Sequence, residues 1–445
     1  MLITIIDQGA VAGAFALRCA EHGHTVKWFI EPKPGNNQKI GTGLHPSIER
    51  VKQWLPWAGK SDLVVSTENG NYLPKLEMLR KRGIAVFAPS QAVADLEIDR
   101  KKGMDFLEAH GIKVPEYKTF KNIKEAQKYV YDNPARYVFK TLGDNDNKAL
   151  SFVGKTPQQM IQQLQTWMDN KVPIKGDVML QEFIEGVEFG CSRWVGKDGF
   201  FGPIEESFEH KKLFPSEKGV NTGEMGTVAK YVTESKLFDK VLKPLEEDLV
   251  KMGAFTSVDI NCIIDKKGNP WPLEFTSRWG WPIFNLVLYA HKGDPAQWMY
   301  DACKGKETLK ASKDVMIGIV LVIPPFPFED KDQVTENIPI YGITKKNWEN
   351  IQPQSVMAGK FIDEVDGEMK EVDGWVTAGS YVLVVVETGK TIEDSRDKVY
   401  KIVGEISISD MGYRDDIGEK VIKNLPELQK HGFAGEWEKA DDNGK

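Results

Sequence analysis

Three things are scarce in this sequence: cysteine, long apolar runs and net positive charge. Four cysteines lie far apart and form no Cys-x-x-Cys pair, at Cys19, Cys191, Cys262 and Cys303. This spacing argues against a standard zinc site and fits a reducing cytoplasm. No apolar run approaches the roughly 18 residues of a membrane span. Because the N-terminus has neither a basic region nor a cleavage-like site, we expect no signal peptide and a cytoplasmic protein.

The charge balance limits the kinds of partner. The 445 residues carry a formal net charge of −7 at pH 7, with 41% hydrophobic and 28% charged residues. These fractions are ordinary for a globular protein. The lack of a basic excess argues against a nucleic-acid groove as the main function, because such a groove must neutralise many phosphates. A chain of this length is too long for one compact core, so we expect several lobes.

The first 97 residues alternate between short apolar strands and helices. The expected strands are Met1–Asp7, Thr25–Ile30, Asp62–Ser66 and Ile84–Phe87. The expected helices are Ala14–His22, Pro46–Trp54 and Tyr72–Arg82. This alternation predicts a doubly wound parallel sheet, whose ligands lie beyond the carboxyl ends of the strands. Five residues should line that crevice: Gln8, Gly9, Ser66, Glu68 and Asn69.

The rest of the chain mixes helices and strands. Further helices are expected at Gln91–His110, Pro157–Asn170, Lys236–Met252 and Thr391–Val403. Further strands are expected at Tyr137–Lys140, Asp177–Phe183, Glu188–Val195 and Gly202–Glu206, and a largely β region is expected that includes Val315–Val322 and Gly374–Glu387. The final stretch, His431–Lys445, is charged and contains glycine, so we expect it to be frayed.

The stretch from Ala254 to Pro282 reads as a β-hairpin that carries oxygen ligands. Its outgoing strand holds Asp259 and Asn261, and its returning strand holds Glu274 and Thr276. Residues two apart in a strand share a face, so these oxygens can converge from both strands. Mg²⁺ prefers such hard oxygen ligands beside a phosphate. The alternative is that the acidic side chains only face solvent.

Six collinear motifs relate the chain to a known family. They are DLVV (62–65), GIAVFAPSQAVADLEIDRKKGMDFLEAHGIKVPEY (83–117), VMLQEFIEGVEFG (178–190), GVNTGEMG (219–226), PLEFTSRWGWP (272–282) and GYRDDIG (412–418). With these motifs the chain resembles the glycinamide ribonucleotide synthetase (phosphoribosylamine–glycine ligase) family, whose members are ATP-grasp enzymes of purine biosynthesis. The similarity covers nearly the whole chain.

The resemblance implies an α/β architecture with an ATP-grasp fold. Its parts would be an N-terminal doubly wound parallel α/β domain (residues 1–97) and an ATP-grasp domain (98–312) with a lid subdomain at about 117–184. A mainly β C-terminal domain (313–428) and a charged tail (429–445) would follow.

The resemblance also implies a nucleotide site. Lys140 and Lys148 would contact the phosphates of ATP. Gln181 stands where the family has a glutamate that receives the adenine amine. The main chain of Glu182 and Ile184, with Phe183 between them, would read the adenine edge. Glu188 would hold the ribose hydroxyls.

Metal, catalytic and substrate positions are carried over in the same way. The expected Mg²⁺ ligands are Glu274, Thr276 and Asp259. The expected catalytic residues are Arg278, Lys211 and Glu274. Arg278 can stabilise the transferring phosphoryl charge or a substrate carboxylate. The expected substrate-binding residues are Gln8, Gly9, Asn221, Thr222, Gly223 and Trp279.

The chain departs from the family mainly where it would face substrate. The Glu-Phe-Asn triplet becomes Glu274-Phe275-Thr276, and Arg-Phe-Gly-Asp-Pro-Glu becomes the segment Arg278–Ile283. That segment contains Trp279 and Trp281, which either stack on a flat ligand or pack in the core. Positions that hold the nucleotide are mostly kept. A catalyst with a changed substrate would show this pattern, whereas a broken catalyst should lose its phosphate and metal groups first.

We therefore expect an ATP- and Mg²⁺-dependent carboxylate–amine ligase that acts through an acyl phosphate. Its partners would be small molecules: a carboxylate, either glycine or another amino acid, and an amine. Two alternatives remain open. One is a divergent ligase that joins an amino acid to a different amine, such as a modified nucleotide. The other is a non-catalytic nucleotide-binding protein.

Overall fold

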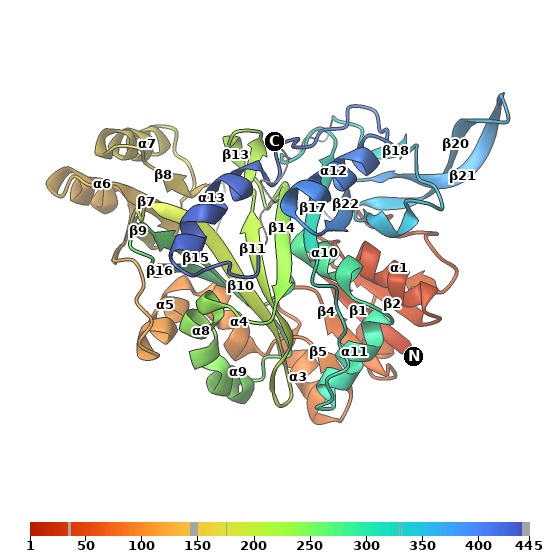
Figure 1. Cartoon of the computed structure of the whole chain (residues 1–445), viewed down its shortest axis with the longest axis horizontal. Coiled ribbons are helices and arrows are strands. Elements are labelled where there is room, and N and C mark those ends of the chain that lie inside the picture. Colours follow the sequence, from red (N-terminus) through yellow and green to blue (C-terminus); the bar gives the residue numbers. More distant parts are fainter. Residues whose placement is uncertain (34–36, 143–149, 175, 329, 331, 438–445) are drawn as a thin grey trace, which may run out of the picture.

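The fold is taken from a computed structural model that describes residues 1–33, 37–142, 150–174, 176–328, 330 and 332–437. Three main sheets organise the chain (Figure 1). They are a five-stranded parallel sheet at the N-terminus, a four-stranded antiparallel sheet and an eight-stranded antiparallel sheet. This α/β arrangement agrees with the predicted ATP-grasp fold with an N-terminal doubly wound domain.

The N-terminal sheet has the order β3-β2-β1-β4-β5. Its strands are β1 (Leu2–Asp7), β2 (Thr25–Ile30), β3 (Ile48–Arg50), β4 (Leu63–Ser66) and β5 (Ala85–Phe87). Helices α1 (Gly13–Glu21), α2 (Leu55–Ala58) and α3 (Leu73–Lys81) connect them. Apart from Leu2, the apolar side chains of β1, β2 and β4 are buried, as expected for strands covered on both faces.

The helix predicted at Pro46–Trp54 is wrong. Residues 48–50 form the edge strand β3, in which Ile48 pairs in parallel with Val26, and the short helix α2 starts only at Leu55. The apolar residues of this segment have helical spacing. The backbone of residues 47–50 nevertheless pairs with β2 and does not form a helix. For example, the Val26 N–H donates to the Ser47 carbonyl.

Two helices predicted as continuous are each divided in two. The stretch 91–110 forms α4 (Gln91–Ile98) and α5 (Arg100–Ala109). Between them Asp99 is extended, and its carboxylate accepts from the amides of Lys101 and Lys102 as the N-cap of α5. The stretch 236–252 forms α8 (Lys236–Val241) and α9 (Glu246–Met252), separated by a 3₁₀ turn that contains Pro244, which has no N–H to donate.

The four-stranded sheet has the order β6-β9-β7-β8 and carries two helices. Its strands are β6 (Tyr117–Phe120), β7 (Tyr137–Thr141), β8 (Phe152–Val153) and β9 (Val178–Glu182). Helices α6 (Ile123–Asp132) and α7 (Pro157–Asp169) pack on it around their own small apolar core, which includes Phe139 and Leu164. This unit forms one end of the molecule (Figure 1) and covers most of the residues for which a lid subdomain was predicted.

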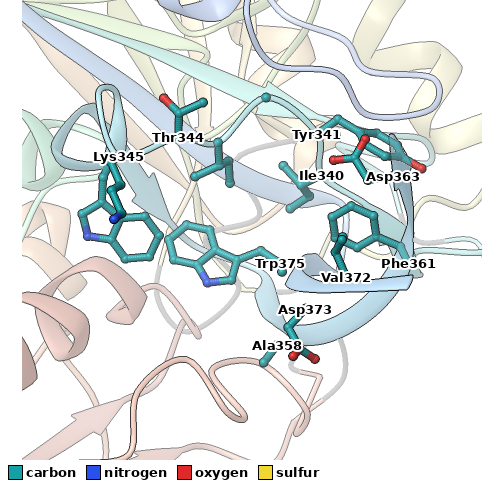
Figure 2. Close-up of a pocket in the computed structure, with 14 residues that line it drawn as sticks. Ile340, Tyr341, Thr344, Lys345, Ala358, Phe361, Asp363, Val372, Asp373 and Trp375 are labelled. Carbon is teal, nitrogen blue, oxygen red and sulfur yellow. The ribbon is translucent and has the colours of Figure 1, made fainter. Parts of the chain in front are cut away.

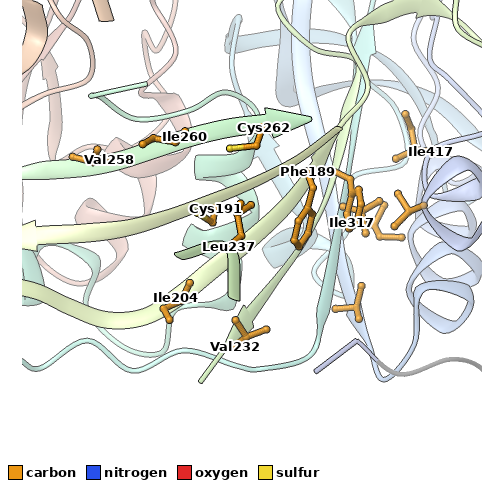
Figure 3. Packing of buried hydrophobic residues seen from close by; sticks show 14 of the residues in the cluster. Phe189, Cys191, Ile204, Val232, Leu237, Val258, Ile260, Cys262, Ile317 and Ile417 are labelled. Carbon is orange, nitrogen blue, oxygen red and sulfur yellow. The ribbon is translucent and has the colours of Figure 1, made fainter. Parts of the chain in front are cut away.

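The eight-stranded sheet has the order β16-β15-β10-β11-β14-β17-β22-β19. Its strands are β10 (Gly186–Gly196), β11 (Gly199–Glu209), β14 (Gly226–Val232), β15 (Thr256–Asp265), β16 (Pro270–Thr276), β17 (Val315–Val322), β19 (Ile351–Pro353) and β22 (Tyr381–Gly389). The main core lies against one face and includes Phe189, Cys191, Ile260 and Ile317 (Figure 3). The sheet continues across residue 313, where a separate C-terminal domain was predicted to begin.

Helices α10 (Ile283–Ala290), α11 (Pro295–Cys303), α12 (Ile392–Val403) and α13 (Glu419–Lys430) complete the main body. A three-stranded sheet of β18 (Glu336–Pro339), β20 (Val356–Val365) and β21 (Glu368–Ala378) projects as a long hairpin (Figure 1). Strands β12 (Lys212–Phe214) and β13 (Lys218–Asn221) form a small separate ribbon.

The C-terminal stretch is better ordered than the sequence suggests. Residues 431–437 follow α13 and dock on the main sheet, with Phe433 0% and Trp437 2% exposed. The expectation of a frayed tail is therefore wrong for these residues, and residues 438–445 lie outside the described part of the chain. In the described residues, every helix is too short or too polar to span a bilayer.

Candidate active site

The polar residues predicted at the carboxyl ends of β1 and β4 do meet. A Cβ atom added to Gly9 would overlap the carboxylate of Glu68, and one added to Gly70 would overlap the amide of Gln8. Gly9 therefore lies against the Glu68 side chain, and Gly70 lies against the Gln8 side chain. Asn69 extends the crevice, because its Nδ2 donates to Oε2 of Glu97 at 2.7 Å. The same Nδ2 donates to Oγ of Ser277 at 3.0 Å, so the N-terminal domain also contacts the residues that follow β16 within the hairpin stretch 254–282.

Glu97, which the sequence analysis did not single out, ties this crevice to Arg278. One carboxylate oxygen accepts from the Ser277 amide at 2.8 Å, and the other lies 3.2 Å from Nε of Arg278. Burial acts to lower the pKa of Arg278, but the nearby carboxylates of Glu97, Glu68 and Glu274 outweigh it and raise that pKa. Arg278 is therefore a fixed cation at the end of the returning strand.

The hairpin places the predicted metal ligands opposite one another. Asp259 pairs with Thr276, and Asn261 pairs with Glu274. Directly opposed residues of an antiparallel pair project on the same face, so the convergence expected from the sequence is confirmed. Glu274 is partly exposed, and its Oε2 accepts from Nη1 of Arg100 at 2.8 Å.

Asn261 is oriented toward acidic groups. Its Nδ2 donates to Oε1 of Glu188 at 2.6 Å and lies 3.2 Å from Oε2 of Glu209. The amide nitrogen therefore links the hairpin to β10 and β11. Its partner Glu188 is the residue expected to hold the ribose.

Lys211 is the cation at the centre of these carboxylates. Its Nζ lies 2.9 Å from Oε1 of Glu188 and 2.7 Å from Oε2 of Glu209. Burial acts to lower the pKa of Lys211, but the two carboxylates raise it well above its usual value. Burial likewise acts to raise the pKa of Glu188, and Lys211 reverses this, so that the net pKa is lowered. Both groups are charged at neutral pH.

Further acidic side chains lie near Glu209, the partner of Lys211. Burial raises the pKa of Glu205 to about 8, and it also raises the pKa values of Asp259 and Glu224. A small cavity of about 40 Å³ is lined by Glu205, Glu209, Asp259, Thr276 and Arg278, among others. Within the described residues, no three His, Cys, Asp or Glu side chains already form a metal-binding group.

The residues predicted to face the nucleotide from the four-stranded sheet lie in its central strands, β7 and β9. Nζ of Lys140, on β7, donates to Oε1 of Gln181, on β9, at 2.8 Å. The amides of Glu182 and Phe183 donate to backbone carbonyls of residues 116 and 136, so the segment that precedes Ile184 is fixed. Lys148, the second predicted phosphate contact, lies outside the described residues.

Of the predicted substrate-binding loop, Thr222 has the clearest contact. Its amide and its Oγ1 both donate to the carbonyl of Lys211, at 2.8 and 3.0 Å. Thr222 therefore positions Lys211. Its neighbours Asn221 and Gly223 are exposed, and their substrate role stays a prediction.

Trp279 packs as the core interpretation predicted. It is 1% exposed, and its indole stacks on Phe284 with ring centroids 3.9 Å apart. Phe15 of α1 meets the same indole edge-on at 5.1 Å. The ring thus joins the N-terminal domain to α10, and its stacking on a ligand finds no support in this packing.

A second cavity lies apart from all of these residues. It has a volume of about 790 Å³ and lies at the base of the projecting hairpin (Figure 2). Its lining includes the rings of Tyr341, Trp348, Phe361 and Trp375. None of the residues predicted from the sequence to bind nucleotide, metal or substrate lines it.

The structure therefore places most of the predicted residues on two neighbouring units. Lys140 and Gln181 belong to the four-stranded sheet, and Glu188, Lys211, Glu274 and Arg278 belong to the main sheet or the residues next to it. Strands β9 and β10 join the two units directly through residues 183–185. Figure 1 shows the two sheets side by side at this junction.

Comparisons with known proteins identify the family of the chain. The model of the phosphoribosylglycinamide synthetase ATP-grasp (A) domain matches residues 100–283, and the C-domain model of the same synthetase matches residues 317–420. A phosphoribosylamine–glycine ligase of Streptococcus pneumoniae is 26% identical over 439 residues, covering 95% of this chain and 100% of the relative. One from Escherichia coli is 25% identical over 447 residues, covering 95% and 99%.

Solved structures show the same fold. The crystal structure of phosphoribosylamine–glycine ligase from Thermotoga maritima superposes with a TM-score of 0.66 at 20% identity, covering 94% of this chain and 100% of that one. A biotin carboxylase domain of the 2-oxoglutarate carboxylase of Hydrogenobacter thermophilus, crystallised with MgADP and bicarbonate, gives a TM-score of 0.59 at 12% identity, covering 97% and 95%.

Proposed function

Because the chain belongs to the phosphoribosylglycinamide synthetase family and is an ATP-dependent ligase of that family, we propose that it joins a small carboxylate to an amine through an acyl phosphate. Glycine and phosphoribosylamine are the first pair to consider. The observation that carries the proposal is the cluster of Glu188, Lys211 and Asn261 beside the Glu274 hairpin.

The chemistry requires the carboxylate to be activated. A carboxylate oxygen attacks the γ-phosphorus of ATP, the bond to the β–γ bridging oxygen breaks, and ADP leaves. The amine then attacks the acyl carbon, an amide bond forms, and phosphate and a proton are released. The protein acts mainly by aligning and neutralising phosphate oxygens. Lys140, Lys211 and Arg278 supply fixed positive charge for this purpose.

The proposed nucleotide contacts divide between the two sheets. Lys140 and Gln181 lie toward the base and α-phosphate, and Glu188 holds the ribose. Both donors to Glu188, from Lys211 and Asn261, use Oε1. We assign the ribose hydroxyls to Oε2.

The residues present fit Mg²⁺. Glu274, Thr276 and Asp259 offer hard oxygens from facing strands, which is the donor set that Mg²⁺ prefers when phosphates supply the other ligands. When bound, Mg²⁺ would neutralise phosphate oxygens during transfer. The partly exposed Glu274 reaches that position only by sharing its carboxylate with Arg100 or releasing it.

A second substrate pair is favoured by one observation. The segment Arg278–Ile283 has no carboxylate, and its Trp279 is committed to the core. The family has an acidic substrate contact in this segment. An enzyme that keeps its phosphate-binding groups but lacks that contact would suit a different amine, such as a modified nucleotide. The main proposed function also includes location in the cytoplasm and participation in purine biosynthesis.

An assay of ADP release tests the proposed ligase function and its substrate pair. Purified protein is supplied with ATP and Mg²⁺ and with glycine plus phosphoribosylamine, and then with a panel of amino acids and amines. Turnover with the first pair supports the ancestral reaction, and turnover only with another pair supports the divergent ligase. ATP binding without ADP release under every pair would point to a non-catalytic nucleotide-binding protein.

The variant Glu274→Ala should abolish this turnover while the unfolding midpoint stays close to that of the parent. Glu368→Ala is the matched control, because Glu368 is an exposed glutamate at the far end of the projecting hairpin. Retained ADP release in Glu274→Ala would remove Glu274 from its assigned role.

A further inference from the structure

One buried polar group near the proposed base site has an unused hydrogen-bonding atom. The side chain of Gln181 is 1% exposed. Its strand β9 is paired on both sides, opposite Tyr117 of β6 and Val138 of β7. The backbone at this position is therefore fixed, and the side chain projects from a rigid strand rather than from a loop.

Lys140 fixes which way the amide of Gln181 points. A lysine ammonium has three donors and no acceptor, whereas a glutamine amide has an oxygen that accepts and an NH₂ group that donates. The contact of 2.8 Å with Nζ must therefore be made by Oε1. The NH₂ group is then directed away from Lys140.

That NH₂ group has no acceptor of its own in the described residues. Nε2 of Gln181 is buried and makes no hydrogen bond there. A buried donor without a partner is destabilising, and proteins rarely leave one in a paired strand without a reason. An acceptor on a bound ligand would satisfy it. The atom is thus a preformed donor that awaits an acceptor.

We propose that Gln181 presents this donor to the purine edge and lets the site bind 6-oxopurine triphosphates as well as ATP. The inference rests on the proposed function, which places the nucleobase beside Gln181. A purine offers N7 as an acceptor. Position 6 is a donor in adenine and an acceptor in guanine and hypoxanthine. A fixed donor therefore has no preference for the 6-amino group, whereas a carboxylate at residue 181 would require it.

Binding measurements test the inference without turnover. Isothermal titration with Mg²⁺ but without carboxylate or amine gives Kd values for ATP and for inosine triphosphate (ITP). In the parent protein the two values should agree within about fivefold, the size of one ordinary hydrogen bond. In Gln181→Glu the ratio of the Kd of ITP to that of ATP should rise by about tenfold or more, because a carboxylate repels O6 and accepts from the amine.

Two further variants keep the result interpretable. Gln181→Leu removes the donor without adding charge, so it should weaken ITP binding by about fivefold relative to ATP. Gln162→Glu makes the same charge change on the exposed face of α7 and should leave the ratio unchanged. Unfolding midpoints of all variants confirm that each is folded.

The outcomes separate the inference from the function it rests on. If the parent binds ATP at least tenfold more tightly than ITP, and Gln181→Glu leaves that ratio unchanged, the donor role of Gln181 is overturned while the ATP-dependent reading stands. If the parent binds neither triphosphate in the presence of Mg²⁺, both the proposed function and this inference are overturned.

Discussion

At the scale of single residues, the site is organised by one lysine shared between two carboxylates. Lys211 contacts Glu188 and Glu209, and Asn261 donates to the same two side chains. Buried carboxylates without a cation would repel each other and would favour their protonated forms. The lysine therefore keeps Glu188 ionised at neutral pH, which is the state that can accept from a ribose hydroxyl.

We predict that Lys211→Met reverses the way in which the contribution of Glu188 to the free energy of unfolding depends on pH. In the parent the lowered pKa of Glu188 contributes stability that is present above the unfolded pKa and is lost as the pH falls through the folded value. Without Lys211, burial raises the folded pKa, so stability is instead lost as the pH rises. The variant should lose about 1–2 kcal/mol at pH 8, since Lys211 is about one-third exposed and partly screened, and less at pH 5.

Urea unfolding at the two pH values measures this difference. Lys212→Met is the control, because the neighbouring lysine has no ion pair in the described residues. Equal losses at pH 5 and pH 8 in Lys211→Met would contradict the assigned coupling between Lys211 and Glu188.

The sequence predicted these individual residues unevenly. Glu188, Glu274 and Arg278 were found because they lie within motifs of a known family, and Lys211 was carried over from the same resemblance. Glu97 also lies within one of the motifs (83–117) but was missed, because its contacts, to Ser277 and Arg278, are 180 and 181 residues away along the chain. No local pattern marks a glutamate on a helix as a partner of a distant loop.

At the scale of secondary-structure elements, residues 431–437 form a clasp on the main sheet. Nε1 of Trp437 donates to Oε2 of Glu206 on β11 at 2.7 Å, and Ser235 donates to the other oxygen. Oε1 of Glu436 accepts from the amides of Thr233 and Glu234. This segment connects the end of the chain to the strand that precedes Lys211.

We predict that Trp437→Ala lowers the free energy of unfolding by about 3–5 kcal/mol, the usual range for removal of a buried tryptophan. Trp437→Phe keeps most of the packing and removes the hydrogen bond. Burial raises the pKa of Glu206 to about 7, so its contribution to stability is lost as the pH rises through that value. The hydrogen bond from the Trp437 indole favours the ionised form of Glu206. Because Trp437→Phe lacks this bond, it should be more destabilised at pH 8.5 than at pH 6.

Denaturant unfolding of both variants at both pH values provides the measurement. A deficit in Trp437→Phe that is independent of pH would show that the indole does not stabilise the Glu206 carboxylate. A loss below about 1 kcal/mol in Trp437→Ala would show that the clasp is not part of the cooperative fold.

Strands were predicted better than helices for a physical reason. The run Leu63-Val64-Val65 in β4 is apolar because the parallel sheet is covered on both faces. Helix ends depend on single capping residues, and the break at Asp99 arises because its carboxylate caps α5 while α4 ends. The error at residues 46–54 arose because apolar residues three apart suit both a helix and an edge strand followed by a turn.

At the scale of the whole molecule, the proposed nucleotide would bridge two sheets with separate cores. The lid has its own apolar cluster around Phe139 and Leu164, whereas the main sheet packs around Phe189 and Ile260. In the proposed arrangement, contacts to the base would come from the first unit, and contacts to the ribose and metal would come from the second. Affinity for ATP with Mg²⁺ therefore requires both units to be held in one arrangement.

We predict that ATP with Mg²⁺ stabilises the whole chain against unfolding, by about 2.7 kcal/mol at a ligand concentration one hundred times Kd. ATP with a chelator should stabilise it less, because the phosphate oxygens then lack the cation that Glu274, Thr276 and Asp259 are proposed to hold. Glu274→Ala should lose the difference between the two conditions but keep part of the effect of ATP alone.

Thermal unfolding with ATP plus Mg²⁺, with ATP plus chelator and with Mg²⁺ alone measures each part. A shift that is the same with Mg²⁺ and with chelator would contradict the proposed metal site, and the absence of any shift would contradict the bridging of the two sheets by ATP.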